Sequence, residues 1–88
     1  MNFEWDESKR QTNIQKHGID FVDAIRIFEG YTVTVEDSRY GYNESRFWTM
    51  GLLGTTLIFI VHTYIHEKTI RLISARKATK HEQKQFFA

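Results

Sequence analysis

The feature that most constrains the fold is a long apolar segment in the second half of the chain, residues 56–65, which read TLIFIVHTYI. β-Branched and aromatic residues dominate it, and it holds too few polar residues for a strand with one face in water. We therefore expect a strand that is covered on both faces, at the centre of a sheet. Its most apolar part, residues 57–61, is far too short to cross a bilayer.

Shorter strand patterns flank this segment. Residues 31–36 (YTVTVE) alternate in strand fashion, and residues 46–53 (RFWTMGLL) form the next apolar run. The sequences GTT at residues 54–56 and HEK at residues 66–68 indicate hairpin turns on either side of the central segment. The last strand is predicted over residues 69–75 (TIRLISA). Short turns between successive strands predict an antiparallel meander sheet of three or four strands.

Two helices are predicted before the sheet. Asp6 is a suitable N-cap for a helix over residues 7–17, because its carboxylate can accept from the free N–H groups of the first turn, and Gly18 can end it. That segment holds few apolar residues, so we expect it on the surface. Asp20 can cap a second, amphipathic helix over residues 20–29. Its apolar face at helical spacing comprises Phe21, Ala24, Ile25 and Phe28.

The two ends of the chain complete the prediction. Residues 3–5 (FEW) are either a short strand or an N-terminal anchor. Thr79 and Glu82 have the spacing of a capping box and begin a C-terminal helix, whose end would dock through Phe86 and Phe87. The order of the segments indicates one α+β domain over residues 1–88, a meander sheet with helices on one face.

Charge is distributed unevenly along the chain. The formal net charge is +1, but residues 1–66 hold six Lys/Arg against nine Asp/Glu, and residues 67–88 hold six against two. The first part therefore carries net −3 and the last part net +4. A segregated basic end indicates a polyanionic or acidic partner more directly than the net charge does.

Composition limits the kinds of site that the chain can hold. Cysteine is absent, which excludes disulfides, a thiolate nucleophile and a zinc–thiolate site, and agrees with a cytoplasmic location. The start lacks the charged and apolar regions of a signal peptide, and no membrane partner is expected. His62 and His66 are the only histidines close in sequence, and in a strand they would lie about 13 Å apart. The acidic residues do not cluster as Mg²⁺ ligands. We therefore expect no metal and no cofactor.

Three blocks of residues, in the same order, resemble the BrnT toxins of bacterial type II toxin–antitoxin systems. The third block is VHT at residues 61–63 followed by IRLISARKATKHE at residues 70–82. The second lies in ESRFWTMGLL and includes Glu44, Arg46, Phe47 and Gly51. The first lies in FEWDESKRQTNIQKHGIDFVDA, and its matching positions are Trp5, Asp6, Lys9, Asn13, Lys16, His17, Gly18, Phe21 and Ala24.

This resemblance carries expectations about fold, activity and partners. BrnT toxins are similar in fold to RelE-type ribonucleases, so it implies a small antiparallel sheet flanked by helices. It implies RNA cleavage that inhibits translation, and neutralisation by a BrnA-like antitoxin that carries a DNA-binding domain. The two proteins would form a heterotetramer that represses its own operon and contacts operator DNA only through the antitoxin. One departure is the final KQFFA, where a Tyr or Arg is expected near the last helix.

The chemistry needed to cleave RNA through its own 2′-hydroxyl points to particular side chains. A base must take the 2′ proton, an acid must protonate the leaving 5′ oxygen, and a cation must stabilise the transition state. Histidine suits the proton transfers and arginine suits the phosphate. We expect His17, Arg71, Arg76 and Lys77 to be catalytic. Each has an ordinary alternative. His17 interacts favourably with the dipole at the C-terminal end of its helix, and Arg71 is a charge at a sheet edge that prevents aggregation. Arg76 and Lys77 form a solvated basic turn.

A wider set of residues is expected to contact RNA. Tyr42, in a polar loop beside Arg39, suits stacking on unpaired bases. His62 is either hydrogen-bonded in the core or opens with Tyr64 onto a cleft, and Ser74 either binds the substrate backbone or caps the sheet. The predicted RNA-binding residues are Lys9, Lys16, Arg39, Tyr42, Arg46, His62, Tyr64 and Ser74.

The alternative to an enzyme is a non-catalytic RNA-binding domain or a subunit of a repressor complex. Such a protein would bind RNA with an affinity that falls steeply with salt, because counterions are released, but it would leave no new RNA ends.

Overall fold

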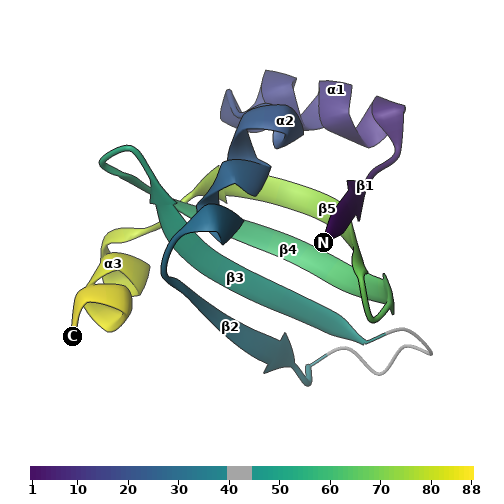
Figure 1. The fold of residues 1–88 in the computed structure, drawn as a ribbon. Helices are drawn as coiled ribbons and strands as arrows, with labels where there is room; N and C mark the ends of the chain where they lie inside the picture. Colours follow the sequence, from purple (N-terminus) through teal and green to yellow (C-terminus); the bar gives the residue numbers. More distant parts are fainter. Residues whose placement is uncertain (40–44) are drawn as a thin grey trace.

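The computed structural model describes residues 1–39 and 45–88. A five-stranded sheet forms its centre, with α1 and α2 above one face and α3 on the opposite side (Figure 1). In chain order the elements are β1 (Asn2–Glu4), α1 (Glu7–His17), α2 (Phe21–Ala24), the 3₁₀ helix η1 (Ile25–Glu29), β2 (Thr32–Asp37), β3 (Arg46–Leu53), β4 (Thr56–His66), β5 (Thr69–Lys77) and α3 (Lys80–Phe87).

The predicted antiparallel meander is present as β2 to β5. The strand order across the sheet is β1-β5-β4-β3-β2, so β4 has a hydrogen-bonded neighbour on each side. Residues 57–60 of β4 are buried, which confirms the central strand covered on both faces. Gly54 begins the turn between β3 and β4 with φ at 63°, a left-handed conformation that glycine adopts without steric cost.

The sheet has a further strand that the meander prediction lacks. β1 pairs in parallel with the first half of β5, with Phe3 opposite Ile70, so the sheet is mixed rather than purely antiparallel. Parallel neighbours need a long crossover connection, and here every other helix and strand but α3 lies between β1 and β5 in sequence. Phe3 also contacts Phe28, with ring centroids 5.3 Å apart. Phe3 and Glu4 of the FEW segment therefore belong to a strand that completes the sheet edge, and Trp5 follows that strand.

The helix ends follow the predicted capping chemistry. The Asp6 carboxylate accepts from the backbone N–H groups of Ser8 and Lys9, and Gly18 ends α1 with φ at 70° and donates to the Ile14 carbonyl. Thr79 and Glu82 form the predicted capping box at the start of α3. These local signals are reliable because the partners lie within one helical turn of each other.

The second predicted helix is shorter than its apolar pattern indicated. α2 is a single turn over four residues, and the chain then winds more tightly as η1. This tighter winding buries Ile27, which is 1% exposed, against the position of Gly51 in β3. The prediction of two regular N-terminal helices is therefore wrong in this detail.

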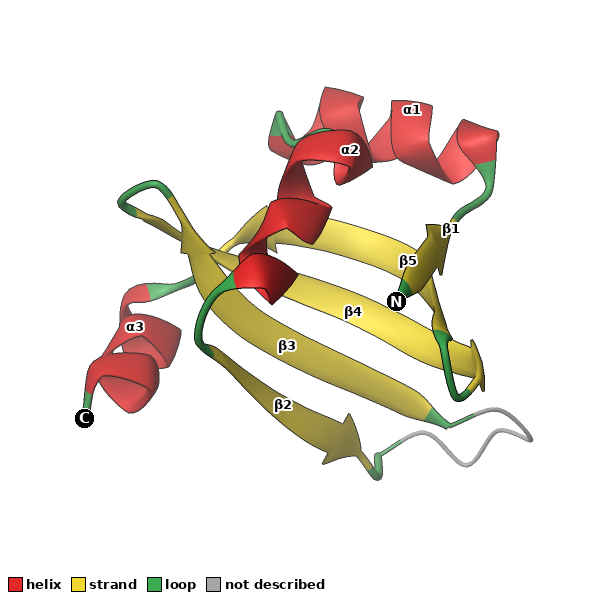
Figure 2. Ribbon diagram, in the orientation of Figure 1, coloured by secondary structure: helices red, strands yellow, loops and turns green. Residues whose placement is uncertain are grey.

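Alternation along β4 separates the two faces of the sheet. Ile58 and Ile60 face α2 and η1 and belong to the larger apolar cluster. Phe59 and Val61 face the other way and belong to a second cluster that includes Phe86 of α3. Helices therefore cover both faces, as Figure 2 shows, and the predicted meander sheet with helices on one face is corrected.

No helix within residues 1–39 and 45–88 combines the length and the apolar character needed to cross a membrane.

Candidate active site

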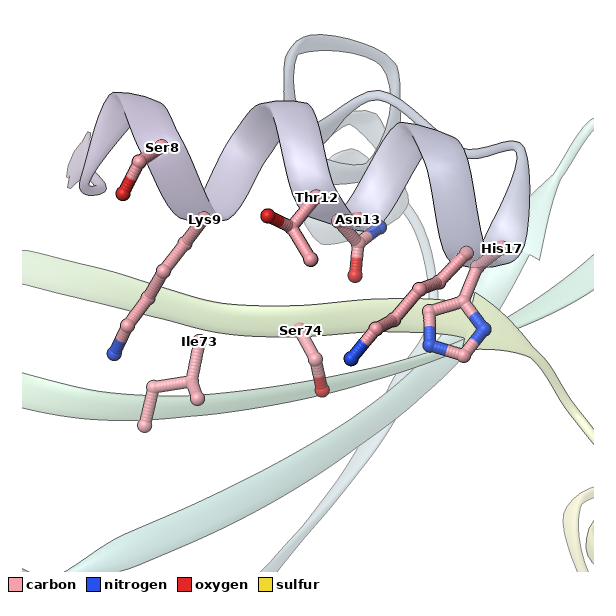
Figure 3. A pocket seen from close by; sticks show the side chains of 8 residues that line it. Ser8, Lys9, Thr12, Asn13, His17, Ile73 and Ser74 are labelled. Carbon is pink, nitrogen blue, oxygen red and sulfur yellow. The ribbon is translucent and has the colours of Figure 1, made fainter.

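A groove of about 250 Å³ lies between α1 and the edge of β5 (Figure 3). Lys9 and Lys16 are separated by seven residues, or two helical turns, so they share one face of α1 and lie about 10 Å apart along its axis. In Figure 3 the Lys9 and His17 side chains reach from α1 past the edge of β5. The lining residues are Ser8, Lys9, Thr12, Asn13, Lys16, His17, Ile73 and Ser74.

Asn13 fixes this face of α1 against the sheet. Its amide donates to the carbonyls of Ile19 and Ala75, at 2.8 Å each, and its side-chain oxygen accepts from the Ala75 N–H at 2.9 Å. β1 covers only the first half of β5, as far as Arg71, so Asn13 satisfies main-chain groups of β5 that lie beyond the reach of β1. The side chain is 4% exposed and therefore acts as a buried connection between helix and strand edge.

A β-bulge shapes the strand side of the groove. Val61 pairs with Ser74 while His62 pairs with Leu72, which leaves Ile73 as an extra residue in β5. Bulges bend the strand and redirect side chains, and they concentrate near functional sites. In Figure 3 Ile73 and Ser74 both point away from α1 on the same side of β5. The bulge therefore places the Ser74 hydroxyl in the groove beside the cations of α1.

The groove is strongly cationic. Lys9, Lys16 and His17 line it together, and none of its lining residues is acidic. The two lysines and the histidine are exposed to solvent, so an incoming phosphate can meet them without a rearrangement of the core. Two ammonium groups flanking a histidine and a hydroxyl can bind a phosphodiester and transfer protons to and from it.

The register of β4 and β5 places three predicted residues on one face. Phe59, Val61 and Thr63 alternate along β4 on the face toward α3. Their partners in β5 are Arg76, Ser74 and Arg71, respectively, so these three residues share that face. Lys77 pairs with Ile58 and therefore lies on the opposite face.

Arg71 extends the cationic groove toward the N-terminus. A second cavity, of about 330 Å³, is lined by Arg71 together with Lys9, which also lines the first groove, and by the carboxylate residue Asp6. The guanidinium of Arg71 pairs with Glu4 of β1 at 2.6 Å, and the two side chains are 51% and 41% exposed. An ion pair this exposed is weakly held, so Arg71 can exchange Glu4 for a phosphate at little cost.

Arg76 is more firmly held. Its guanidinium donates to both carboxylate oxygens of Glu82, at 2.8 and 2.9 Å, and lies 4.2 Å from the centroid of the Phe59 ring. Hydrogen bonds from Arg76 are the largest cause that lowers the pKa of Glu82 to about 2, and Glu82 in turn raises the pKa of Arg76. This bidentate pair fastens α3 to β5.

The four predicted catalytic residues therefore do not form one cluster. His17 and Arg71 lie along the groove at the edge of β5. Arg76 shares a sheet face with Arg71 but is engaged by Glu82, and Lys77 lies on the other face.

The predicted RNA-binding residues are similarly divided. Lys9, Lys16 and Ser74 line the groove. Arg39 forms a bidentate pair with Asp37, at 2.9 and 2.7 Å, which lowers the pKa of that carboxyl, and Arg46 lies at the start of β3 opposite Asp37. Tyr42 lies outside the described residues.

His62 and Tyr64 belong to the face that carries α2 and η1. His62 is 0% exposed, and its Nε2 lies 2.7 Å from the Thr49 hydroxyl, which in turn lies 2.7 Å from the Thr34 hydroxyl. Burial lowers the pKa of His62 to about 4, so the ring is neutral at physiological pH. Its position does not fit a contact with RNA, since no surface of the ring is accessible. Tyr64 is partly exposed and contacts His62 and Phe47.

Sequence reasoning gave Asn13 no role in the site beyond its place in the family resemblance. The helical spacing could have placed it there, because Lys9, Asn13 and Lys16 fall at i, i+4 and i+7 and therefore share one face of the helix. Sequence reasoning also did not assemble a third cavity, on the α3 face of the sheet, whose lining residues come from β2 and the turn after it, β3, β4, β5 and α3.

Within residues 1–39 and 45–88, no three histidine, aspartate or glutamate side chains come close enough together to hold a metal ion. The described part of the chain thus offers cations, a histidine and a hydroxyl for RNA chemistry, rather than a carboxylate cluster.

Comparison with known proteins shows which family the chain belongs to. Residues 5–82 match the family described as the ribonuclease toxin, BrnT, of type II toxin–antitoxin systems. Among solved structures, the chain is similar to the crystal structure of the Brucella abortus ribonuclease toxin BrnT, with 30% identity, 91% of this chain and 99% of that chain covered, and a TM-score of 0.69. A comparison with curated proteins found no match. The predicted resemblance is thereby confirmed, and the chain belongs to the BrnT family of ribonuclease toxins of type II toxin–antitoxin systems.

Proposed function

We propose that this toxin cleaves RNA in the groove between α1 and β5, without a metal ion, by attack of the 2′-hydroxyl on the adjacent phosphodiester. The observation that carries the proposal is that Lys9, Lys16 and His17 meet Ser74 in one groove with no acidic side chain in its lining. A polyanion is attracted to such a surface, and a histidine beside the bound phosphate supplies the proton transfers.

The reaction needs only the chain, the RNA and solvent water. The 2′-hydroxyl loses its proton as its oxygen bonds to phosphorus, the bond from phosphorus to the 5′ oxygen breaks, and that oxygen takes up a proton. The products are a 2′,3′-cyclic phosphate and a 5′-hydroxyl end. His17 transfers one of the two protons and solvent water in the exposed groove exchanges the other, while Lys16 and Lys9 stabilise charge on the phosphoryl oxygens.

Two further side chains have supporting roles in this proposal. Arg71 binds a neighbouring phosphate at the N-terminal end of the groove after it exchanges its exposed partner Glu4. The Ser74 hydroxyl donates a hydrogen bond to a phosphoryl oxygen. Arg76 and Lys77 are left out of the chemistry, since Arg76 holds α3 through Glu82 and Lys77 lies on the other face.

The test is cleavage of a defined RNA by the purified protein in EDTA. His17→Ala should lower the rate by about 10²–10⁴ and Lys16→Ala by about 10²–10³, the usual sizes for a lost proton donor and a lost charge stabiliser. Lys84→Ala is the matched control, because Lys84 is an exposed lysine on α3, outside the groove. The wild-type products should carry cyclic phosphates.

Three results would count against the proposal. Activity that EDTA abolishes and Mg²⁺ restores would refute metal independence. Equal activity of His17→Ala and wild type would refute the assignment of the groove. RNA binding that leaves no new ends would favour the non-catalytic alternative, an RNA-binding or repressor-complex subunit.

We also propose that a BrnA-like antitoxin neutralises the toxin by covering the cationic groove with acidic and apolar residues. Opposite charge supplies fast and selective association with such a surface. Two toxins and two antitoxins would form a heterotetramer that represses its own operon, with operator DNA contacted only by the antitoxin, because such domains read two-fold symmetric sites. Mass measurement of the co-purified complex tests the stoichiometry. Charge reversal by Lys9→Glu with Lys16→Glu should weaken the complex, and unchanged affinity would refute this surface.

A further inference from the structure

The third cavity, of about 390 Å³, lies on the α3 face of the sheet. Its floor is formed by Trp48 of β3 with Phe59 and Val61 of β4. Asp37 and Arg39, at the end of β2, stand on one side. Glu82 and Gln85 of α3 stand on the other side, beside Arg76.

The floor presents an aromatic surface. Trp48 and Phe59 are stacked, with ring centroids 5.2 Å apart and planes inclined by 24°. Arg76 lies over the Phe59 ring, which is 9% exposed and therefore has little surface left for a ligand. Trp48 is only partly buried, so its indole is the accessible aromatic group of this cavity. Aromatic surfaces of this kind bind unpaired bases by stacking.

The charges around the cavity differ from those of the groove. Its two arginines are each paired bidentately with a carboxylate, Arg39 with Asp37 and Arg76 with Glu82. The formal charges of these four residues sum to zero, whereas the groove is lined by lysines without a carboxylate. A phosphate is therefore attracted more strongly to the groove than to the cavity. An uncharged planar group with hydrogen-bond donors and acceptors suits the cavity, because it can stack on Trp48 and bond to the surrounding polar groups.

The cavity and the groove are neighbours on β5. Val61 lines the cavity, and its direct partner across the sheet is Ser74, which lines the groove. Arg76 shares that face two residues farther along, which corresponds to about 7 Å in a strand. A single nucleotide spans such a distance, so one RNA strand can place its phosphate in the groove and its base in the cavity.

We propose that this cavity is a nucleobase-binding subsite that selects guanine next to the cleaved phosphate. Guanine offers its N2 amino donor to a carboxylate and its O6 and N7 acceptors to N–H donors. Asp37 and Glu82 supply carboxylates beside Trp48, and the exposed Gln85 supplies an amide, whereas the two arginines are already paired. The inference rests on the proposed function in one respect: the base that enters the cavity belongs to the RNA strand bound in the groove. The subsite would give the ribonuclease its sequence preference, while the groove performs the chemistry.

The experiment uses the intrinsic fluorescence of Trp48. The chain holds two tryptophans, so Trp5→Phe leaves Trp48 as the only reporter. GMP, AMP, CMP and UMP are titrated into this variant, with ribose 5-phosphate as the probe that lacks a base. GMP should quench Trp48 saturably and with the lowest Kd, and ribose 5-phosphate should not quench it. In the complementary variant Trp48→Leu, GMP should bind on the order of 5- to 150-fold more weakly by equilibrium dialysis, the loss seen when a stacking partner is removed.

A second measurement links the subsite to cleavage and separates its failure from that of the proposed function. Sequencing of RNA ends should show cleavage beside guanine for wild type and a broader distribution for Asp37→Asn and Trp48→Leu. Absence of quenching by every nucleotide, or equal Kd values for all four, would overturn the subsite even if RNA is cleaved in the groove. Saturable quenching led by GMP would support the subsite even if the wild-type protein cleaves no RNA.

Discussion

Replacing Asn13 with alanine should show how much the active groove depends on one buried amide. The change removes three hydrogen bonds, to the Ile19 carbonyl and to the N–H and carbonyl of Ala75, and leaves three buried backbone groups without those partners. At about 1–1.5 kcal/mol for each group, the loss is about 3–4.5 kcal/mol. Alanine returns roughly 0.5 kcal/mol as a better helix former, so we expect a net loss of about 3 kcal/mol. Small domains hold only about 5–15 kcal/mol in total.

Urea unfolding followed by circular dichroism measures this loss. With a slope of about 1.5 kcal/mol/M, the midpoint should fall by about 2 M. Thr12→Ala is the control, because Thr12 lies beside Asn13 on α1 and is exposed, and its midpoint should stay within about 0.3 M of wild type. Hydrogen exchange at the Ala75 amide should accelerate in Asn13→Ala but not in the control. A midpoint shift below about 0.5 M would refute the view that Asn13 fastens α1 to the edge of β5.

Three further predictions concern packing and pH. Gly51→Ala should cost about 1–3 kcal/mol, because an added Cβ would lie 2.9 Å from the Ile27 Cβ, whereas Gly30→Ala, with no atom within 4 Å, should change little; thermal melting of the two variants compares them. The pKa of His62 is lowered from 6.5 to about 4 in the folded state, so stability should fall by roughly 3 kcal/mol as pH drops from 6.5 to 4, and His62→Phe should remove that slope in urea titrations. The pKa of Glu82 is lowered from 4.5 to about 2, so its contribution to the free energy of unfolding should be complete above pH 4.5 and disappear as pH falls from 4.5 to 2. Glu82→Gln should therefore reduce the pH dependence of the free energy of unfolding only between pH 4.5 and 2. A slope that persists in either variant would contradict the corresponding assignment.

Local signals predicted most of the elements correctly. The Asp6 cap, the Gly18 stop and the capping box of Thr79 and Glu82 act within a single turn, so the residues that make them are adjacent in the sequence. The central position of β4 followed from its apolar length, because a strand with two covered faces has no polar alternation. Hairpin turns then required its neighbours to be antiparallel.

The errors concern contacts between distant segments. The parallel pairing of Phe3 with Ile70 joins residues at opposite ends of the chain, and no local pattern encodes it. The placement of α3 on the second face depends on Phe86 meeting the cluster around Phe59, and an amphipathic pattern does not say which face of a sheet it will cover. The change from α2 to η1 reflects the fit of Ile27 over Gly51, a contact between two separate elements.

The functional residues show the same division. The three blocks of residues identified the family. The charge pattern pointed to the basic end of the chain, whereas the lysines and the histidine of the groove lie on α1. Which cations meet was decided by the tertiary structure. Arg76 is engaged by Glu82 because α3 returns to β5, and Lys77 lies on the far face because strand register alternates.

The sequence by itself therefore determined most of the elements, their caps, the family and the types of side chain available for RNA chemistry. Only the tertiary structure decided that α1 lies along the edge of β5, where Asn13 binds Ala75 and a bulge turns Ser74 toward Lys9, Lys16 and His17. The physical reason is the range of the interactions. Caps and periodicity depend on neighbours in the chain, whereas the groove depends on hydrogen bonds and pairings between residues about sixty positions apart.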